Sequence, residues 1–166
     1  IAMGSVFHTL FAAEAVEYRA LARLGYDAIT YGNHDFDFGA EALQKMFSSA
    51  HSKDSLLQFP KLLSSNLKFK KEQESGSCPV TGSPQNYALF NRNGLRIGVF
   101  GVMGENSWNV IGKDRNSLMF EDPVESSRKV VAELKGMGAD YIIALSHGGA
   151  LNGDDLRLAK KVGGTD

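Results

Sequence analysis

Apolar side chains recur along the chain at two spacings, one typical of helices and the other of strands. The helical spacing predicts four helices: 9–24, 39–50, Pro123 to Gly138, and one that begins at Gly153 or Asp154. Short apolar runs predict strands at 28–31, 62–66 and 141–145, and the last reads as a strand buried on both faces. Because strands alternate with helices, the pattern predicts an α/β fold with a layered sheet flanked by helices.

Turn signals divide these segments. Asn93-Gly94 stands between two apolar runs, 87–91 and 95–102, and this dipeptide is a strong hairpin signal. A hairpin adds an antiparallel strand pair, so we expect the sheet to be mixed. Residues 68–86 and 104–119 show neither spacing, and we predict that both are loops.

Aspartates precede two of the predicted helices. Asp122 stands immediately before Pro123, a pair typical of a helix N-terminus. Asp37 lies two residues before Gly39, and we expect it to cap the helix that begins there. Alternatively, Asp35 and Asp37 form a pair of carboxylates that takes part in chemistry.

Bulk composition narrows the class of protein. The chain has 166 residues, of which 43% are hydrophobic and 22% charged, which is typical of one globular domain. Its net charge of -1 gives no reason to expect binding to nucleic acid or an anionic membrane. No run is apolar for long enough to span a bilayer. Cys78 is the only cysteine, which excludes an internal disulfide.

Two of the predicted strands are followed by candidate chemistry. Gly32-Asn33-His34-Asp35 follows the strand at 28–31, and Ser146-His147-Gly148-Gly149 follows the strand at 141–145. Ligand sites in α/β proteins gather at the carboxyl ends of strands. Asn, His and Asp side chains suit divalent metal ions, which assist phosphoryl transfer. A single histidine after a strand is more often structural, but two such histidines make the metal and structural readings about equally well supported.

Four stretches of the chain resemble one family in the same order. Residues 25–39, which contain Gly-Asn-His-Asp-Phe-Asp-Phe-Gly, resemble the Asn-His block of calcineurin-like metallophosphoesterases, closest to their bacterial 5′-nucleotidase branch. Three further stretches also resemble this branch: Met3-Gly4-Ser5, 120–124 and 139–147. The resemblance implies a four-layer αββα fold and hydrolysis of phosphate esters, with 5′-nucleotides as the foremost substrate class. It also implies two divalent metal ions, although it does not distinguish Mn, Zn, Mg, Ca and Fe.

The resemblance assigns roles residue by residue. Asn33 and His147 would bind the same metal ion, and His34 would contact the phosphate and assist the leaving group. Asp35 stands where the branch often has Glu, and we expect it to support the site without binding metal itself. Gly32 would permit a tight turn. The backbone of Gly148 either approaches the phosphate or forms a plain turn.

Other motifs of the family's site are missing from this sequence. The Asp-x-His pair and Gly-Asp motif would precede Ile1, and a Gly-His-x-His motif would follow Asp166. We therefore expect 1–166 to be one catalytic domain truncated at both ends. Alone, it should bind metal weakly and turn over little substrate, because affinity depends on ligand number.

Two alternatives to a phosphoesterase stay open. The same scaffold could cleave a sulfur-oxo ester, or the chain could be a non-catalytic module that binds a nucleotide or a partner chain. The expected partner is a small phosphoester or nucleotide, without nucleic acid. A periplasmic, cell-surface or secreted location follows from the resemblance alone, and the oligomeric state cannot be read from the sequence.

Several further residues have less specific readings. His8 is more simply a surface histidine at a helix entry than a residue of the site. His51 stands at a predicted helix end, where a cation suits the helix dipole, and we expect no functional role for it. Trp108 and Asn106 follow a predicted strand, and they either line a substrate pocket or pack the loop.

Overall fold

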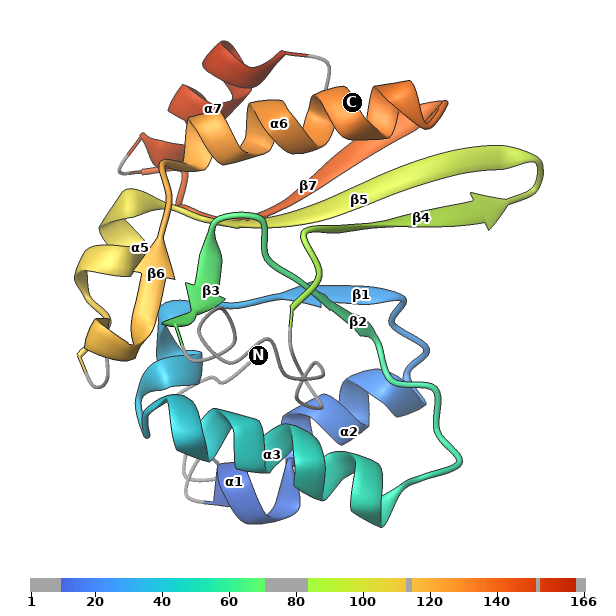
Figure 1. Ribbon diagram of the computed structural model, residues 1–166. Coiled ribbons are helices and arrows are strands. Elements are labelled where there is room, and N and C mark those ends of the chain that lie inside the picture. Colours follow the sequence, from blue (N-terminus) through green and yellow to red (C-terminus); the bar gives the residue numbers. More distant parts are fainter. Residues whose placement is uncertain (1–9, 71–83, 113–114, 152, 164–166) are drawn as a thin grey trace.

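The computed structural model describes residues 10–70, 84–112, 115–151 and 153–163. Four layers follow one another in Figure 1: two helices, a three-stranded sheet, a two-stranded sheet, and a group of three helices. The outer helices are α6 (Pro123–Gly136) and α7 (Asp154–Val162) on one side. On the other side lie α1 (Phe11–Glu14), α2 (Val16–Arg23) and α3 (Ala40–Lys53). This arrangement confirms the expected α/β layers.

The two sheets that pack face to face differ in the relative directions of their strands. In one, β1 (Ala28–Thr30) pairs in parallel with β2 (Lys61–Leu63). In the other, β5 (Leu95–Met103) pairs antiparallel with β4 (Tyr87–Arg92) and parallel with β7 (Tyr141–His147). A separate antiparallel pair joins β3 (Leu67–Phe69) to β6 (Leu118–Phe120). The prediction of mixed strand directions is therefore confirmed.

The hairpin between β4 and β5 turns where Asn-Gly predicted it. Asn93 and Gly94 both adopt positive φ values, of 51° and 84°. A two-residue hairpin turn with positive φ at both positions matches the right-handed twist of its strands. Glycine and asparagine tolerate this conformation better than other residues, which is why the local sequence was sufficient to locate the turn.

Apolar side chains fill the three spaces between the four layers. The largest cluster lies between the β1–β2 sheet and α1–α3, and it includes Phe11, Phe36, Leu43, Met46 and Phe47. A second cluster, including Phe100, Val131, Leu134 and Ile142, lies under α6 and α7. Between the two sheets, the smaller third cluster contains Leu63, Ala88 and Val99.

Two glycines of β5 let its neighbours approach on both faces. A Cβ atom at Gly98 would lie 2.9 Å from both Cδ atoms of Leu134 in α6. A Cβ atom at Gly101 would lie 2.1 Å from the carbonyl oxygen of Leu63 in the other sheet. Positions 98 and 101 are three apart in the sequence, an odd spacing, so they face opposite sides of the strand. Gly98 thus accommodates the helix layer, and Gly101 sets the spacing between the sheets.

The prediction of one continuous helix over residues 9–24 was wrong. The described part, from residue 10 onward, contains two helices, α1 and α2, separated at Ala15, which adopts a left-handed φ of 50°. Ala15 is completely buried, and the Ser49 hydroxyl of α3 donates a hydrogen bond to the Ala12 carbonyl oxygen. Packing on α3 therefore overrides the local helical preference, and apolar spacing alone does not detect a break of one residue.

The segment predicted as a strand over 62–66 is only partly one. Strand β2 ends at Leu63, and residues 64–66 connect it to β3 through hydrogen bonds of buried polar groups. The backbone N–H and the hydroxyl of Ser65 both donate to the Gly101 carbonyl oxygen at 2.8 Å. Asn66 exchanges side-chain hydrogen bonds with the backbone of Met103. The partners that hold this segment are far away in sequence, so its own residues did not predict the link.

Both predicted loops contain regular structure in their described parts. Strand β3 extends to Phe69, inside the predicted loop 68–86. Within 104–119 lie the helix α5 (Glu105–Asn109), the short 3-10 helix η3 (Arg115–Ser117) and the start of β6. The loop prediction was wrong for these described parts, because elements of three to five residues are too short to show a periodic apolar pattern. Residues 71–83 and 113–114 of the predicted loops lie outside the described residues.

Strand β7 is not buried on both faces, so this prediction also was wrong. Ile142 is buried under α6, whereas Tyr141 and Ile143 are 49% and 41% exposed. The strand forms one edge of the three-stranded sheet. Its apolar run therefore reflects one buried face together with an open strand edge, which residue type alone cannot separate from a central strand.

One of the two predicted helix caps is confirmed. The Asp122 carboxylate accepts hydrogen bonds from the backbone N–H groups of Val124 and Glu125, both at 2.9 Å. The prediction for Asp37 was wrong, because Gly39 precedes α3 and no side chain caps this helix. The Asp37 carboxylate contacts His34 instead.

We expect Asp122→Ala to lower the free energy of unfolding by about 1 kcal/mol, as the loss of a helix cap typically does. Asp122→Asn should cost less, because an amide oxygen also caps. Hydrogen bonds from the backbone N–H groups of Glu125 and Val124, together with Arg157, hold the pKa of Asp122 below its usual value despite an opposing effect of burial. The stabilisation should therefore be present above about pH 4 and disappear as the pH falls through that lowered pKa.

Urea unfolding of each variant at pH 7 and at pH 3 measures these effects. Glu125→Ala is the matched control, because Glu125 lies in the same turn and, among the described residues, its side chain forms only an exposed pair with Arg128. It should change stability by less than about 0.5 kcal/mol. Equal stabilities of Asp122→Ala and Glu125→Ala would contradict the role of the cap.

Candidate metal and phosphate site

The candidate site lies where the carboxyl ends of β1 and β7 meet. Asn33 begins the 3-10 helix η2 (Asn33–Phe36), which starts shortly beyond Thr30, the last residue of β1. His147 is the last residue of β7, and not part of a loop after the strand as the sequence suggested. The Nε2 atom of His147 lies 2.8 Å from the Oδ1 atom of Asn33, although 114 positions separate these residues in sequence. The structure thus brings together the two residues predicted to bind one metal ion.

Gly32 provides the space that this contact needs. Its φ of -112° is an extended conformation open to any residue, so a tight turn does not explain the glycine. Instead, a Cβ atom at this position would lie 3.0 Å from Cε1 and 3.2 Å from Nε2 of His147. The His147 imidazole therefore packs directly over the Gly32 backbone, where a side chain would force it to move.

His34 lies beside this pair with a partner of its own. Its Nδ1 atom is 3.0 Å from Oδ2 of Asp37, and its side chain is 57% exposed. Because a carboxylate only accepts hydrogen bonds, Nδ1 carries the hydrogen in this contact. The other ring nitrogen, Nε2, is then the atom available for proton transfer to a ligand.

Asp35 points in a different direction from its neighbours. It is 1% exposed, and its Oδ2 atom accepts a hydrogen bond of 2.8 Å from the backbone N–H of Gly32. A buried carboxylate that bonds the backbone immediately before Asn33 fixes the path of the chain into η2. This geometry matches a supporting role in which Asp35 does not itself bind metal.

The carboxyl end of β7 is held from the side of α7. The Ser146 hydroxyl donates to Oδ1 of Asp155 at 2.6 Å, and the backbone N–H of Gly104 donates to the His147 carbonyl oxygen at 3.1 Å. A Cβ atom at Gly148 would lie 2.6 Å from Oδ1 of Asp155, so this glycine is needed for close packing against α7. Ser146 and Gly148, the residues on either side of His147 in the sequence, are therefore both held against α7.

Electrostatics favour the neutral form of His147. The partial burial of the imidazole is the main cause that lowers its pKa below the usual value. The nearby His34 lowers the pKa as well, while Asp35 and Asp155 act in the opposite direction. At neutral pH the ring is therefore neutral, and only a neutral ring offers a nitrogen lone pair to a metal ion.

The separation between Asn33 and His147 fits two neighbouring ligands of one ion. Donor atoms about 2.1 Å from a metal and at right angles to each other lie about 3 Å apart. An amide oxygen and an imidazole nitrogen also suit the divalent ions of phosphoryl transfer. Over the described ranges, no group of three or more His, Cys, Asp and Glu residues is placed to hold an ion.

The remaining candidate residues lie away from the Asn33–His147 pair or outside the described residues. The Nδ1–H of His51 donates a hydrogen bond to the Phe47 carbonyl oxygen, and its ring packs at a tilt on Phe59, where nothing suggests a functional role. Trp108 stacks on Phe120 with ring centroids 4.9 Å apart, which favours the loop-packing reading. The backbone N–H of Asn106 donates to Asp154. His8 and Cys78 lie outside the described residues.

Sequence reasoning missed three residues that hold the site together. Asp37 is the partner of His34, and Ser146 with Asp155 anchors the end of β7. The only available signal for Asp37 was its spacing of three residues from His34, which in a 3-10 helix puts two side chains on one side. No local signal pairs Ser146 with Asp155, because that contact depends on how α7 packs.

Comparison with known proteins agrees with the fold and the motif. A snake-venom 5′-nucleotidase from Gloydius brevicauda is 31% identical over 164 residues, which cover 98% of this chain and 25% of that protein. The crystal structure of a 5′-nucleotidase precursor from Thermus thermophilus matches with a TM-score of 0.74 at 30% identity, covering 95% of this chain and 28% of that one. No family model matches the chain.

Two solved structures below 25% identity show the fold alone. One is a calcineurin-like phosphoesterase from Bacillus subtilis, with 22% identity and a TM-score of 0.65 over 96% of this chain and 50% of that one. The other is a sulfate thiohydrolase from Thermus thermophilus, with 19% identity and a TM-score of 0.73 over 99% and 27% of the two chains.

The layered fold places the chain in the same fold class as the calcineurin-like phosphoesterase from Bacillus subtilis. The chain belongs to the 5′-nucleotidase family of this class, as its motif predicted. It spans about a quarter of the length of the two 5′-nucleotidases described above.

We expect Gly32→Ala to displace the His147 imidazole with little loss of stability, because an accessible side chain can give way to the new methyl group. The free energy of unfolding should change by less than about 1 kcal/mol, whereas the imidazole NMR signals of His147 should shift. Gly136→Ala is the control, since a Cβ atom there meets no atom within 4 Å. Unchanged His147 signals in Gly32→Ala would contradict the close packing.

Proposed function

We propose that this chain carries part of a divalent-metal site that hydrolyses phosphate esters, with 5′-nucleotides as the substrate class. The observation that carries the proposal is the 2.8 Å contact between His147 Nε2 and Asn33 Oδ1, with His34 adjacent in sequence to Asn33. Membership of the 5′-nucleotidase family supports the reaction and the substrate class. The calcineurin-like family generally uses divalent metals, which supports an ion at this contact.

Each residue of the site has a separate task in this proposal. Asn33 and His147 would hold one metal ion through Oδ1 and Nε2. A bound divalent ion would supply a hydroxide nucleophile and neutralise charge on the phosphate oxygens. His34 would bind the phosphate and give a proton from Nε2 to the departing oxygen, while the hydrogen bond from Nδ1 to Asp37 would orient the ring. Asp35 would keep the chain entering η2 in position.

The backbone around Gly148 is assigned to packing in this proposal, and not to phosphate binding. Its close approach to Asp155 accounts for a glycine at this position. A phosphate beside that carboxylate would meet a like charge, which disfavours binding. Gly32 likewise serves the site by leaving room for His147.

The alternative of a sulfur-oxo ester hydrolase has weaker support. The sulfate thiohydrolase of similar fold shares only 19% identity with this chain, so the likeness concerns the fold and not the substrate. If the chain were a non-catalytic module, its function would not account for the arrangement of His34, Asp37 and a neutral His147. Turnover of 5′-nucleotides, compared with thiosulfate-type substrates in the presence of Mn²⁺ or Zn²⁺, distinguishes the three readings.

Location and partners are proposed more broadly. One relative is a snake-venom protein, which supports our expectation of a periplasmic, cell-surface or secreted location. Among the described residues, no helix has the length and apolar character needed to cross a membrane. A nucleotide or a related small phosphoester is the partner that the family relationship supports.

We expect His34→Ala, in the full-length protein, to lower turnover of a 5′-nucleotide by about 10² to 10⁴, the usual contribution of a general acid. Metal content should stay the same, because Asn33 and His147 are untouched. His51→Ala is the matched control, as it removes a histidine that lies away from the site. Wild-type turnover by His34→Ala would rule out the assigned role.

We expect His147→Ala to lower the metal content of the same protein, because it removes one of few ligands. Elemental analysis after dialysis, with His34→Ala measured in parallel, separates loss of metal from loss of proton transfer. If His147→Ala keeps the full metal content of the wild type, His147 is not a ligand.

A further inference from the structure

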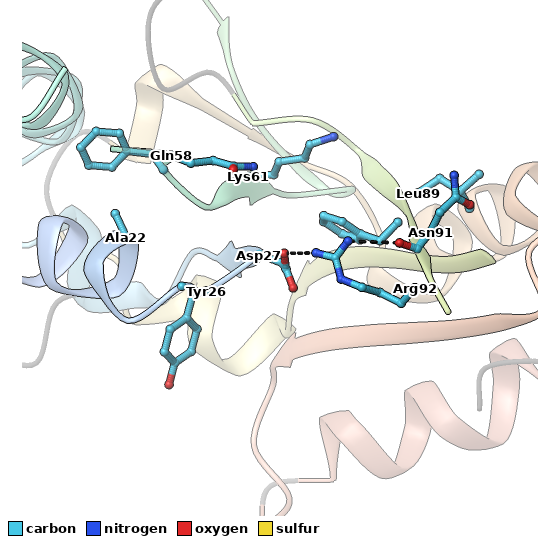
Figure 2. Close-up of a pocket in the computed structure, with 11 residues that line it drawn as sticks. Ala22, Tyr26, Asp27, Gln58, Lys61, Leu89, Asn91 and Arg92 are labelled. Atoms are coloured by element: carbon cyan, nitrogen blue, oxygen red, sulfur yellow. Dashed lines mark hydrogen bonds and ion pairs between the residues drawn. The ribbon is translucent and has the colours of Figure 1, made fainter. Parts of the chain in front are cut away.

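A cavity of about 640 Å³ opens at the amino-terminal ends of β1 and β2. Its lining comes from the turn before β1, the segment that enters β2, and the end of β4 (Figure 2). Asn33 follows the opposite end of β1, so the cavity and the candidate metal site are at different ends of this strand. Its volume lies within the range of about 300–1,000 Å³ typical of small-molecule sites.

Phe59 forms an apolar wall of the cavity, and neighbouring residues hold its ring in place. The Phe59 ring stacks on Tyr18, with ring centroids 4.9 Å apart and an angle of 23° between the rings. The Tyr18 hydroxyl donates a hydrogen bond to the Pro60 carbonyl oxygen, directly after Phe59. His51 covers another part of the Phe59 ring, with centroids 4.4 Å apart. This wall is therefore formed before any ligand binds.

Two cations line the cavity, and one of them is already engaged. The Arg92 guanidinium pairs with Asp27 and also donates to the Asn91 carbonyl oxygen, as Figure 2 shows. The Lys61 ammonium lies 5.5 Å from the centre of the Phe90 ring and forms no ion pair within the described part of the chain. The charged residues of the lining are Lys61, Arg92 and Asp27, which leaves a net charge of +1.

We propose that this cavity binds a small organic anion that carries a flat ring. The anionic group pairs with the Lys61 ammonium, and the ring lies against the Phe59 wall. The side-chain amide of Gln58, which also lines the cavity, supplies hydrogen bonds. A monoanion matches the net charge of the lining, and the ring exchanges water for contact with an ordered aromatic surface. This proposal is independent of the phosphoesterase function.

NMR titration of the ¹⁵N-labelled chain with 2-naphthoate tests the proposal. The amide signals that shift should belong to residues around the cavity, such as Asp27, Lys61 and Asn91. The neutral probe 2-naphthamide should bind at least about tenfold more weakly, because it has the same ring without the charge. Acetate, which has the charge without the ring, should also bind at least about tenfold more weakly.

Lys61→Met removes the charge and keeps most of the side chain that covers Phe90. It should weaken binding of 2-naphthoate about tenfold or more and leave binding of 2-naphthamide unchanged. Lys129→Met, an exposed position on α6, is the control and should bind both probes as the wild type does. Well-dispersed spectra of both variants establish that they are folded.

Three results would overturn the proposal. They are equal affinity for 2-naphthoate and 2-naphthamide, unchanged affinity of Lys61→Met for 2-naphthoate, and shifts centred on Asn33 and His147. The last result would place the anion at the candidate metal site. The binding test does not measure phosphoesterase activity. Failure of the proposed cavity and failure of the proposed phosphoesterase function can therefore be told apart.

Discussion

The contact between the two sheets at Gly101 determines where the site residues meet. The Gly101 carbonyl oxygen accepts hydrogen bonds from both the N–H and the hydroxyl of Ser65, and no Cβ atom fits between Gly101 and Leu63. The same missing Cβ would lie 2.5 Å from the Thr30 hydroxyl, at the end of β1. Gly101 pairs with Leu145 in β7. The chain beyond Thr30 and the chain beyond Leu145 therefore leave the sandwich at the same end of the strands. Asn33 and His147 therefore meet because the sheets are close.

His147 illustrates how the fold fixes both the position and the charge of one side chain. Gly32 leaves room for the ring on one side, and Ser146 and Gly148 hold the strand end against Asp155 on the other. Partial burial lowers the pKa of the imidazole, so the neutral ring is present before a metal ion binds. In the proposed metal site, less free energy would then be needed to order and deprotonate this imidazole, which would favour binding. The neighbouring strand ends thus determine both the position of the His147 imidazole and its charge.

Features that depend on near neighbours in sequence were predictable, whereas those that depend on packing were not. The turn at Asn93-Gly94 and the cap at Asp122 each require only a local conformation, and both predictions are confirmed. The break at Ala15 and the exposed face of β7 follow from distant packing and strand order. The same division applies to the site. The Asn-His motif could be found in the sequence, but nothing local predicted that Asp155 would anchor the strand that carries His147.

The tight turn of η2 explains how consecutive residues reach three different partners. A 3-10 helix has three residues per turn, so successive side chains point about 120° apart. Asn33 points to His147, His34 to solvent and Asp37, and Asp35 into the protein toward the Gly32 N–H. In an α-helix with 3.6 residues per turn, His34 and Asp37 would be less closely aligned. Capping of α3 by Asp37 would leave His34 without this partner.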